Sequence, residues 1–330
     1  MPKVTVIIPN YNHERYLKQR IDSVLNQTFQ DFELIILDDK STDNSKEVIE
    51  QYRSHPKVSK IVYNEINSGS TFKQWNKGIR LAQGELVWLA ESDDDASEFF
   101  LEEMVDRFNQ NSTLGIVYCD SYYMNEQSEK LQCTHLWKNE RFSTNRWDND
   151  FINTGINEVN DYLIFHNVID NASSALFKKE TLFKVGLADE SFRYAGDMFL
   201  YTKLLLISDI AYVSKPLNYF RDHLVNTSKE SFKNGLKYLE LVLIYNKIIL
   251  NNKTINKTTR EKKYQQALND YKIFVSIHLK NTKTFSSLIK GHYRILESNW
   301  FDSIKLFIGV LKSVLRKAAK STFHKTSVSS

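Results

Sequence analysis

The chain has 330 residues, 42% of them hydrophobic and 25% charged, a composition typical of a globular protein with one large α/β domain and an appendage, or with two domains. The net charge of +4 is small, and no dense Lys/Arg stripe with interleaved aromatics occurs before residue 230, which argues against nucleic-acid binding. Two cysteines, Cys119 and Cys133, exclude a disulfide scaffold and a cysteine-based zinc site. The N-terminal apolar run is too short for a secretion signal, and no stretch approaches the roughly 18 apolar residues of a membrane span. We therefore expect a cytoplasmic protein.

Short β-branched runs alternate with segments of helical spacing over the first 120 residues. The pattern predicts strands at 4–8, 32–37, 58–63, 86–90 and 114–119, and helices at 14–26, 44–53, 71–82 and 98–109. Such alternation indicates βαβ units and a mostly parallel sheet. Residues 120–165 are polar and aromatic and are interpreted as loops, residues 172–230 return to mixed α/β patterning, and the remainder is helical with a linker at 251–263.

The first two strand ends carry candidate nucleotide contacts, because ligands of such sheets bind beyond the carboxyl ends of the strands. Pro9 and Tyr11 end the first strand, and the tyrosine ring could stack on a flat base or simply pack on its own helix. Asp38 and Asp39 end the second strand, where adjacent carboxylates are costly unless something satisfies them. Asp39 could accept hydrogen bonds from a base or a ribose, and helix capping is the alternative.

The end of the fourth strand is the strongest signal. Glu91-Ser92-Asp93-Asp94-Asp95 places four acids in five residues, and such a cluster is costly without a cation. Hard divalent metals prefer oxygen ligands, and Mg²⁺ usually combines one or two carboxylates with substrate phosphates. A metal that bridges a nucleotide diphosphate is therefore predicted, with a solvated acidic loop as the alternative.

Three residues later in the chain are further candidates. Asp197 interrupts the apolar run from 192 to 206, so it could be a general base or a helix N-cap. Arg221 and His223 follow a strand-like segment and could contact phosphate or metal, or could lie on a loop without a function.

Taken together, these stretches resemble the family 2 glycosyltransferases, which have the glycosyltransferase A fold. The likeness runs in order over roughly residues 3–228, through VTVIIPNYN, VLNQTFQDFELIILDDKSTDNS, NSGSTFKQWNKGIRLAQGE, LVWLAESDDD, NASSALFKKETLFKVG, AGDMFLYTKLL and AYVSKPLNYFRDHLVNTS. The resemblance implies an α/β nucleotide-sugar-binding domain at 1–228, of Rossmann-like type with flanking helices. A helical extension at 229–330 lies outside it.

The resemblance also implies roles for particular residues. Glu91-Ser92-Asp93 stands where the family has its Asp-x-Asp motif, so Asp93 would bind Mg²⁺ or Mn²⁺ and Asp197 would be the catalytic base. The nucleotide contacts would come from Pro9, Tyr11, Asp39, Glu91 and Ser92, with Arg221 and His223 closing over the diphosphate. Three positions depart from the family pattern: Glu91 replaces an aspartate, Gly196 replaces a glutamate, and Trp75 stands where many members have an arginine. Since Trp75 cannot supply the contact of that arginine, Lys73 is the residue left to contact the diphosphate.

The activity that the resemblance implies is inverting transfer of a hexosyl or N-acetylhexosaminyl group. The donor would be a nucleotide-diphosphate sugar of the UDP type, and the acceptor a hydroxyl of a glycan or lipid-linked molecule in bacterial surface polysaccharide synthesis. The alternative is a catalytically silent nucleotide-sugar-binding assembly partner, against which the presence of both Asp93 and Asp197 argues. A nucleotidyltransferase would have a glycine-rich loop after the first strand, and PNYNHERY contains no glycine.

The last hundred residues contain one further pattern. Between 300 and 320, apolar residues share one helical face and lysines and arginines share another. Such a basic amphipathic helix can lie on the inner face of the cytoplasmic membrane, and packing on the catalytic domain is the equally good alternative.

Overall fold

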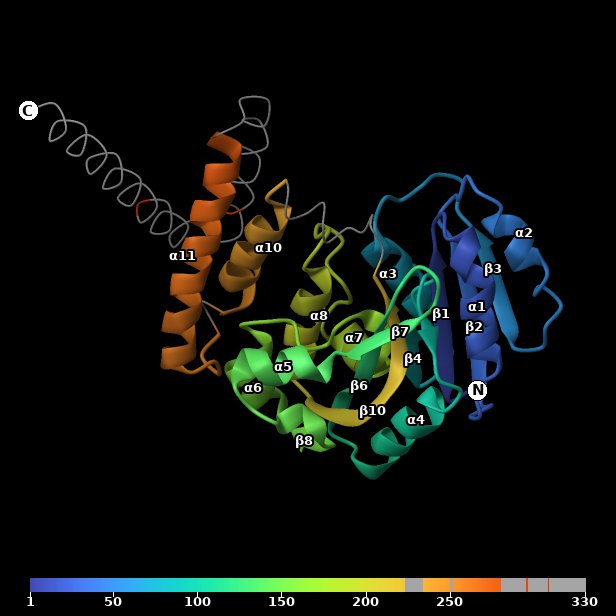
Figure 1. Cartoon of the computed structure of the whole chain (residues 1–330), viewed down its shortest axis with the longest axis horizontal. Helices are drawn as coiled ribbons and strands as arrows, with labels where there is room; N and C mark the ends of the chain where they lie inside the picture. Colours follow the sequence, from blue (N-terminus) through green and yellow to red (C-terminus); the bar gives the residue numbers. More distant parts are fainter. Residues whose placement is uncertain (223–233, 250–251, 280–294, 296–307, 309–330) are drawn as a thin grey trace, which may run out of the picture. The chain divides into compact units, whose positions relative to one another are not determined.

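The computed structural model describes residues 1–222, 234–249 and 252–279, together with Ile295 and Ile308 (Figure 1). The chain divides into two compact units, Met1–Asn226 and Thr227–Ser330, called here the α/β unit and the helical unit. Among the described residues, no helix is both long enough and apolar enough to cross a membrane.

One sheet organises the α/β unit. Its strand order is β3-β2-β1-β4-β9-β6-β10-β5, with β7 paired to β6 and β8 paired to β10. Pairing is parallel from β3 through β4 and between β6 and β10, whereas β9, β5, β7 and β8 pair antiparallel. The α/β fold is thus confirmed, and the sheet is mixed rather than mostly parallel. The strands are β1 Val4–Asn10, β2 Phe32–Asp38, β3 Val58–Tyr63, β4 Leu86–Leu89, β5 Asp95–Ala96, β6 Leu114–Met124, β7 Lys130–Cys133, β8 Phe151–Asn153, β9 Ala175–Lys178 and β10 Asp209–Arg221.

Helices flank this sheet, and every residue of β1 and β2 is buried, as expected for central parallel strands (Figure 1). Helix α1 illustrates the spacing, because it buries Leu17, Ile21 and Val24 at intervals of three and four residues. The helices of the α/β unit are α1 Glu14–Leu25, α2 Ser45–Glu50, α3 Thr71–Leu81, α4 Phe100–Gln110, α5 His135–Phe142, α6 Gly155–Glu158, α7 Lys179–Lys184 and α8 Gly196–Leu205, with the short turns η1 Arg146–Asp148, η2 Val159–Leu163 and η3 Ala172–Ser174.

The nine elements predicted before residue 120 are all present, but the prediction of loops for 120–165 was wrong. Strand β6 continues to Met124, and β7, α5, β8, α6 and η2 follow it. These elements are short and are held in part by buried ion pairs, Lys138 with Asp170 and Arg146 with Glu158, both joined at 2.6 Å. Because these elements bury charged side chains, their sequence shows no hydrophobic periodicity, and the pattern therefore does not predict them.

The helical unit contains α10 Leu236–Ile244, η4 Tyr245–Ile249 and α11 Lys257–Leu279, and α10 packs against α11. The predicted linker at 251–263 was wrong from residue 257, because α11 begins there. The polar sequence of α11 is typical of an exposed linker, but Lys263 is fully buried and Asp270 is nearly so. Of the amphipathic segment 300–320, only Ile308 is described, so the membrane interpretation lies outside the described residues.

Candidate active site

The ends of β1, β2 and β4 bring their following residues to one edge of the sheet. Asn10 lies opposite Asp38, and Ile7 lies opposite Leu89, in parallel register. Pro9 is buried within β1, whereas the Tyr11 side chain just beyond it is 45% exposed. An exposed ring at a strand end is accessible to a flat partner.

Asp39 is almost fully buried and is held by protein donors. Its Oδ1 accepts bonds from Asn64 Nδ2 at 2.6 Å, Ser68 N at 2.8 Å and Gln74 Nε2 at 3.0 Å. Its Oδ2 accepts a bond from the Ser68 hydroxyl at 2.7 Å. The turn at Gly69, where φ is +61°, follows Ser68, whose N–H and hydroxyl both bind this carboxylate. A carboxylate oxygen can accept two bonds, so Oδ2 retains capacity for one more donor.

The carboxylates of the acidic loop between β4 and β5 differ in burial and in their hydrogen-bond partners. Asp94 accepts bonds from Asn171 Nδ2 at 2.5 Å and from the Arg221 backbone N–H at 3.0 Å. Asp95 accepts one from Gln19 Nε2 at 2.7 Å, and the buried Ser92 hydroxyl lies 2.8 Å from a ring nitrogen of His13. Glu91 and Asp93 remain half-buried at the same loop.

Arg20 is the cation under this loop, and the sequence analysis missed it. It is fully buried on α1 with its guanidinium 4.8 Å from the Trp88 ring centre, and none of its nitrogens has a hydrogen-bond partner within the described structure. Burial lowers its pKa, and the charges of Asp94 and Asp95 oppose that change. A basic residue on the buried face of α1 is the only sequence signal that could have indicated it.

The same loop fits a divalent cation. Burial is the main cause that raises the pKa of Glu91 and of Asp94, and the negative charge of Asp93 raises both pKa values further. Carboxylate oxygens that repel one another in a poorly solvated loop are the ligands that Mg²⁺ and Mn²⁺ accept. Two buried arginines, Arg20 and Arg221, do not neutralise four acids.

The basic residues predicted for the diphosphate lie in different surroundings. Arg221 is buried, and its guanidinium donates to Asp93 O at 2.7 Å, Asn125 O at 2.9 Å, Ser128 Oγ at 3.0 Å and Gln19 Oε1 at 3.0 Å. In this arrangement Arg221 fastens the acidic loop, and its contact to the diphosphate stays a prediction. Lys73 is exposed in the first turn of α3, and His223 lies outside the described residues.

Asp197 is half-buried in the first turn of α8. Its Oδ2 accepts a bond from Asn167 Nδ2 at 2.9 Å, and its Oδ1 accepts one from the Met198 backbone N–H at 2.7 Å. Asn167 begins the segment 167–173, whose Asn171 binds Asp94 and whose Ser173 hydroxyl accepts a bond from the Glu91 backbone N–H at 3.0 Å. One segment thus contacts both Asp197 and the acidic loop.

The three departures from the family pattern are physically connected. Trp75 Nε1 donates to Glu91 Oε1 at 2.6 Å. The Trp75 ring meets the Phe72 ring edge-on, with centroids 5.1 Å apart. A Cβ at Gly196 would lie 2.5 Å from Phe72 Cε2, so the Phe72 ring occupies the space beside Gly196.

A second polar cluster was also missed. His135 Nδ1 lies 2.6 Å from Asp120 Oδ2, and Cys133 offers a third ligand atom, with all three atoms within 4.8 Å of one another. The short separation of His135 and Asp120 is that of a hydrogen-bonded pair. Thr134 joins this pair to Asp170, since its hydroxyl lies 2.8 Å from Asp120 Oδ1 and 2.7 Å from Asp170 Oδ2.

Known structures share this fold. Staphylococcus aureus TarS in complex with UDP aligns over 92% of this chain and 83% of its own, with a TM-score of 0.65 and 19% identity. The mannosyltransferase PcManGT of Pyrobaculum calidifontis, in complex with GDP-Man and Mn²⁺, aligns over 95% of this chain and 87% of its own, with a TM-score of 0.58 and 17% identity. At such identities the likeness establishes the fold alone.

Sequence comparison establishes the family. The minor teichoic acid biosynthesis protein GgaA of Bacillus subtilis (strain 168) is 29% identical over 208 residues, which are 61% of this chain and 43% of that protein. Matches to several curated relatives span less than half of their length, down to 36%. The profile of Glycosyl transferase family 2 matches residues 5–170, half of the chain. The chain therefore belongs to glycosyltransferase family 2.

Proposed function

We propose that this protein transfers one sugar, with inversion, from a UDP-type nucleotide sugar to a hydroxyl of a glycan or lipid-linked acceptor in bacterial surface polysaccharide synthesis. The observation that carries the proposal is the segment 167–173, which holds Asp197 at one end and the acidic loop at the other. When an acceptor hydroxyl displaces a diphosphate, a base must act on the hydroxyl and a metal-binding loop must act on the diphosphate. A single segment that contacts both groups would keep them in a fixed relative position.

Asp197 would act as the general base. It would take the proton of the acceptor hydroxyl while that oxygen forms the new bond to the anomeric carbon, whose bond to the diphosphate oxygen breaks on the opposite side. The bonding electrons would leave with the nucleoside diphosphate. A positioned base contributes about 10²–10⁴-fold in rate. The Asn167 bond to Oδ2 orients the carboxylate for this task.

The nucleotide would lie along the edge formed by β1, β2 and β4. Tyr11 would stack on the base, with Pro9 framing it, and Asp39 Oδ2 would accept one bond from a base N–H or a ribose hydroxyl. Glu91 and Ser92 would border the ribose, and Lys73 is the exposed cation proposed for the diphosphate. TarS was solved with UDP, and this supports the uridine assignment.

Asp93 would hold Mg²⁺ or Mn²⁺, with Glu91 beside it. The ion would neutralise the charge that develops on the leaving diphosphate. PcManGT was solved with Mn²⁺, which supports the cofactor. The relative from Bacillus subtilis is a teichoic acid biosynthesis protein, which supports the cell-surface role.

The test is a screen of the full chain against UDP-, GDP- and TDP-sugars with Mn²⁺ or Mg²⁺, in which donor hydrolysis and transfer to a glycoside panel are measured. Asp197→Asn should retain donor binding and lose transfer about 10²-fold or more, because the amide cannot accept a proton. Asp161→Asn, at an exposed acid of η2, is the matched control and should behave as wild type. A loss below tenfold in Asp197→Asn would assign the base elsewhere.

A further inference from the structure

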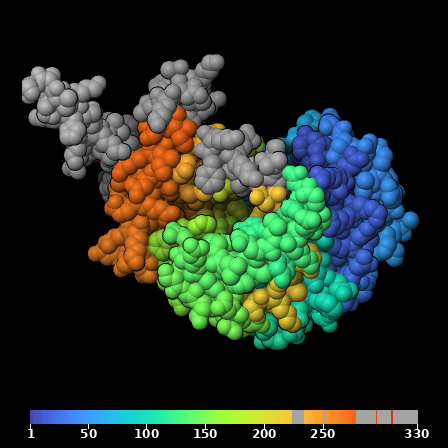
Figure 2. Space-filling view, viewed as in Figure 1, coloured from blue at the N-terminus to red at the C-terminus, as the bar shows by residue number. Residues whose placement is uncertain are grey.

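Two aromatic rings that the proposed mechanism does not use lie together in the α/β unit. Trp137 on α5 and His166 after η2 have ring centroids 4.8 Å apart and planes inclined at 45°. His166 is exposed and Trp137 is half-buried, so the pair presents ring surface to solvent. Helix α5, in green, lies on the face of this unit that is turned to the viewer in Figure 2.

The ring pair is tethered beside the proposed base. His166 directly precedes Asn167, which donates to Asp197. Trp137 Nε1 donates to Asp170 Oδ1 at 3.0 Å, and the next residue, Asn171, donates to Asp94. Both rings are thus attached to the segment that runs from Asp197 to the acidic loop. The rings are therefore connected, through Asn167, to the side chain of Asp197.

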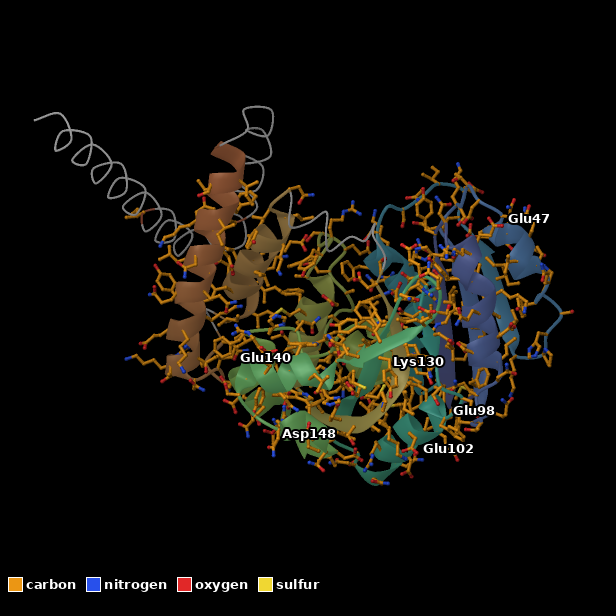
Figure 3. All side chains as sticks on the ribbon, viewed as in Figure 1. Glu47, Glu98, Glu102, Lys130, Glu140 and Asp148 are labelled. Carbon is orange, nitrogen blue, oxygen red and sulfur yellow. The ribbon has the colours of Figure 1, made fainter. Side chains whose placement is uncertain are left out.

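The charges around the rings disfavour an anionic acceptor. Of the three acids between Gly155 and Ser174, Glu158 and Asp170 are buried in ion pairs and Asp161 is exposed. Lys138, on α5, is fully buried and paired with Asp170 at 2.6 Å. Glu140 on α5 and Asp148 in η1, both labelled in Figure 3, are exposed acids. Arg141 on α5 is an exposed base, but Glu140, Asp148 and Asp161 outnumber it. A polyphosphate chain would meet negative charge here.

We propose that Trp137 and His166 form the platform on which the acceptor lies, and that the acceptor ends in a neutral pyranose. The C–H groups of a pyranose face carry partial positive charge, and the face of an aromatic ring is negative, so the two surfaces are complementary. A linear alditol phosphate offers neither a flat apolar face nor a suitable charge. The inference rests on the proposed function and names its acceptor class.

The experiment measures transfer by the full chain to octyl pyranosides of neutral sugars and to poly(ribitol phosphate), with the donor found by the screen above. Trp137→Ala should raise the KM for the best pyranoside roughly three- to tenfold, the scale of one aromatic contact. Donor KM and donor hydrolysis should not change. Trp137→Phe should stay within about twofold, because it keeps a ring and loses only the bond to Asp170. Leu136→Ala, at the exposed neighbour on α5, is the matched control and should behave as wild type.

Three results would overturn the inference: an unchanged acceptor KM in Trp137→Ala, an equal loss in Trp137→Phe and Trp137→Ala, or transfer to poly(ribitol phosphate) with none to any pyranoside. The second would show that Trp137 acts only through its bond to Asp170. Wild-type protein that neither hydrolyses nor transfers any donor would instead contradict the proposed function. The two failures are therefore distinguishable.

Discussion

The contact between Gly196 and Phe72 allows a sharp test of how Asp197 is positioned. In Gly196→Ala, the new Cβ would lie 2.5 Å from Phe72 Cε2, 2.6 Å from Phe72 Cζ and 2.9 Å from Phe192 Cβ. The Phe72 ring is nearly buried and rests edge-on against Trp75, and Phe192 is fully buried. Neither neighbour can move freely, so the first turn of α8 must shift.

Overpacking of this kind costs about 1–3 kcal/mol. For a domain of this size each kcal/mol lowers Tm by roughly 2–4 °C, so Tm should fall by about 2–12 °C in differential scanning calorimetry. Since Asp197 is the next residue, kcat should fall as well, by up to about 10² for a shift of 1 Å, with little change in donor KM.

The double variant Phe72→Leu/Gly196→Ala provides the control. Leucine lacks the two ring atoms that the new Cβ would meet, so the double variant should recover part of the Tm and kcat lost in Gly196→Ala, while the contact to Phe192 Cβ remains. The loss should therefore be strongly non-additive. If Gly196→Ala leaves both Tm and kcat unchanged, or if the two losses simply add, the steric explanation is wrong.

The other predictions concern the nucleotide and the metal. Asp93→Ala should abolish the Mn²⁺-dependent part of nucleoside diphosphate binding, measured by titration calorimetry, and unchanged affinity would contradict the metal assignment. Tyr11→Ala should weaken nucleotide binding and Tyr11→Phe should not, because stacking needs the ring; equal losses would show that the hydroxyl matters. Arg20→Met should lower Tm without metal, because it removes the cation under four acids, and should enlarge the Tm gain from Mn²⁺, because it removes a charge that repels the ion. An equal gain in wild type and variant would show that Arg20 does not act on this loop electrostatically.

The strand ends were predictable because they depend on local patterns. Apolar runs fix β1, β2 and β4, and parallel pairing then brings Tyr11, Asp39 and Glu91 to one edge whatever the loops do. Contacts between distant residues were not predictable. Arg221 has the residue type of a phosphate ligand, yet its donors are engaged by Asn125, Ser128, Gln19 and the Asp93 carbonyl, from parts of the chain that no spacing rule connects.

Buried charged residues explain why the sequence pattern did not predict the elements between 120 and 165 or the start of α11 at residue 257. Lys138 and Lys263 have the sequence signature of solvent-facing residues, and both are fully buried. Lys138 is neutralised by Asp170 at 2.6 Å. Around Lys263, burial lowers the pKa of the lysine to about 8, and the nearby charge of Asp270 opposes that shift. A buried charge needs its partner, and the partner of Lys138 lies 32 positions along the chain, beyond the reach of a periodicity argument.

The departures at Trp75, Glu91 and Gly196 are best understood as one compensated change. The longer arm of Glu91 reaches the Trp75 indole, and the ring of Phe72 that packs on Trp75 fills the space in which a side chain at position 196 would lie. A glutamate at position 196 would therefore meet Phe72. An arginine at position 75 would replace the indole N–H that donates to Glu91 and would remove the edge contact to Phe72. Gly196→Glu should therefore cost less stability when Phe72 is replaced by a smaller residue in the same variant. The site is consequently specified by a set of mutually dependent residues, which no single position reveals.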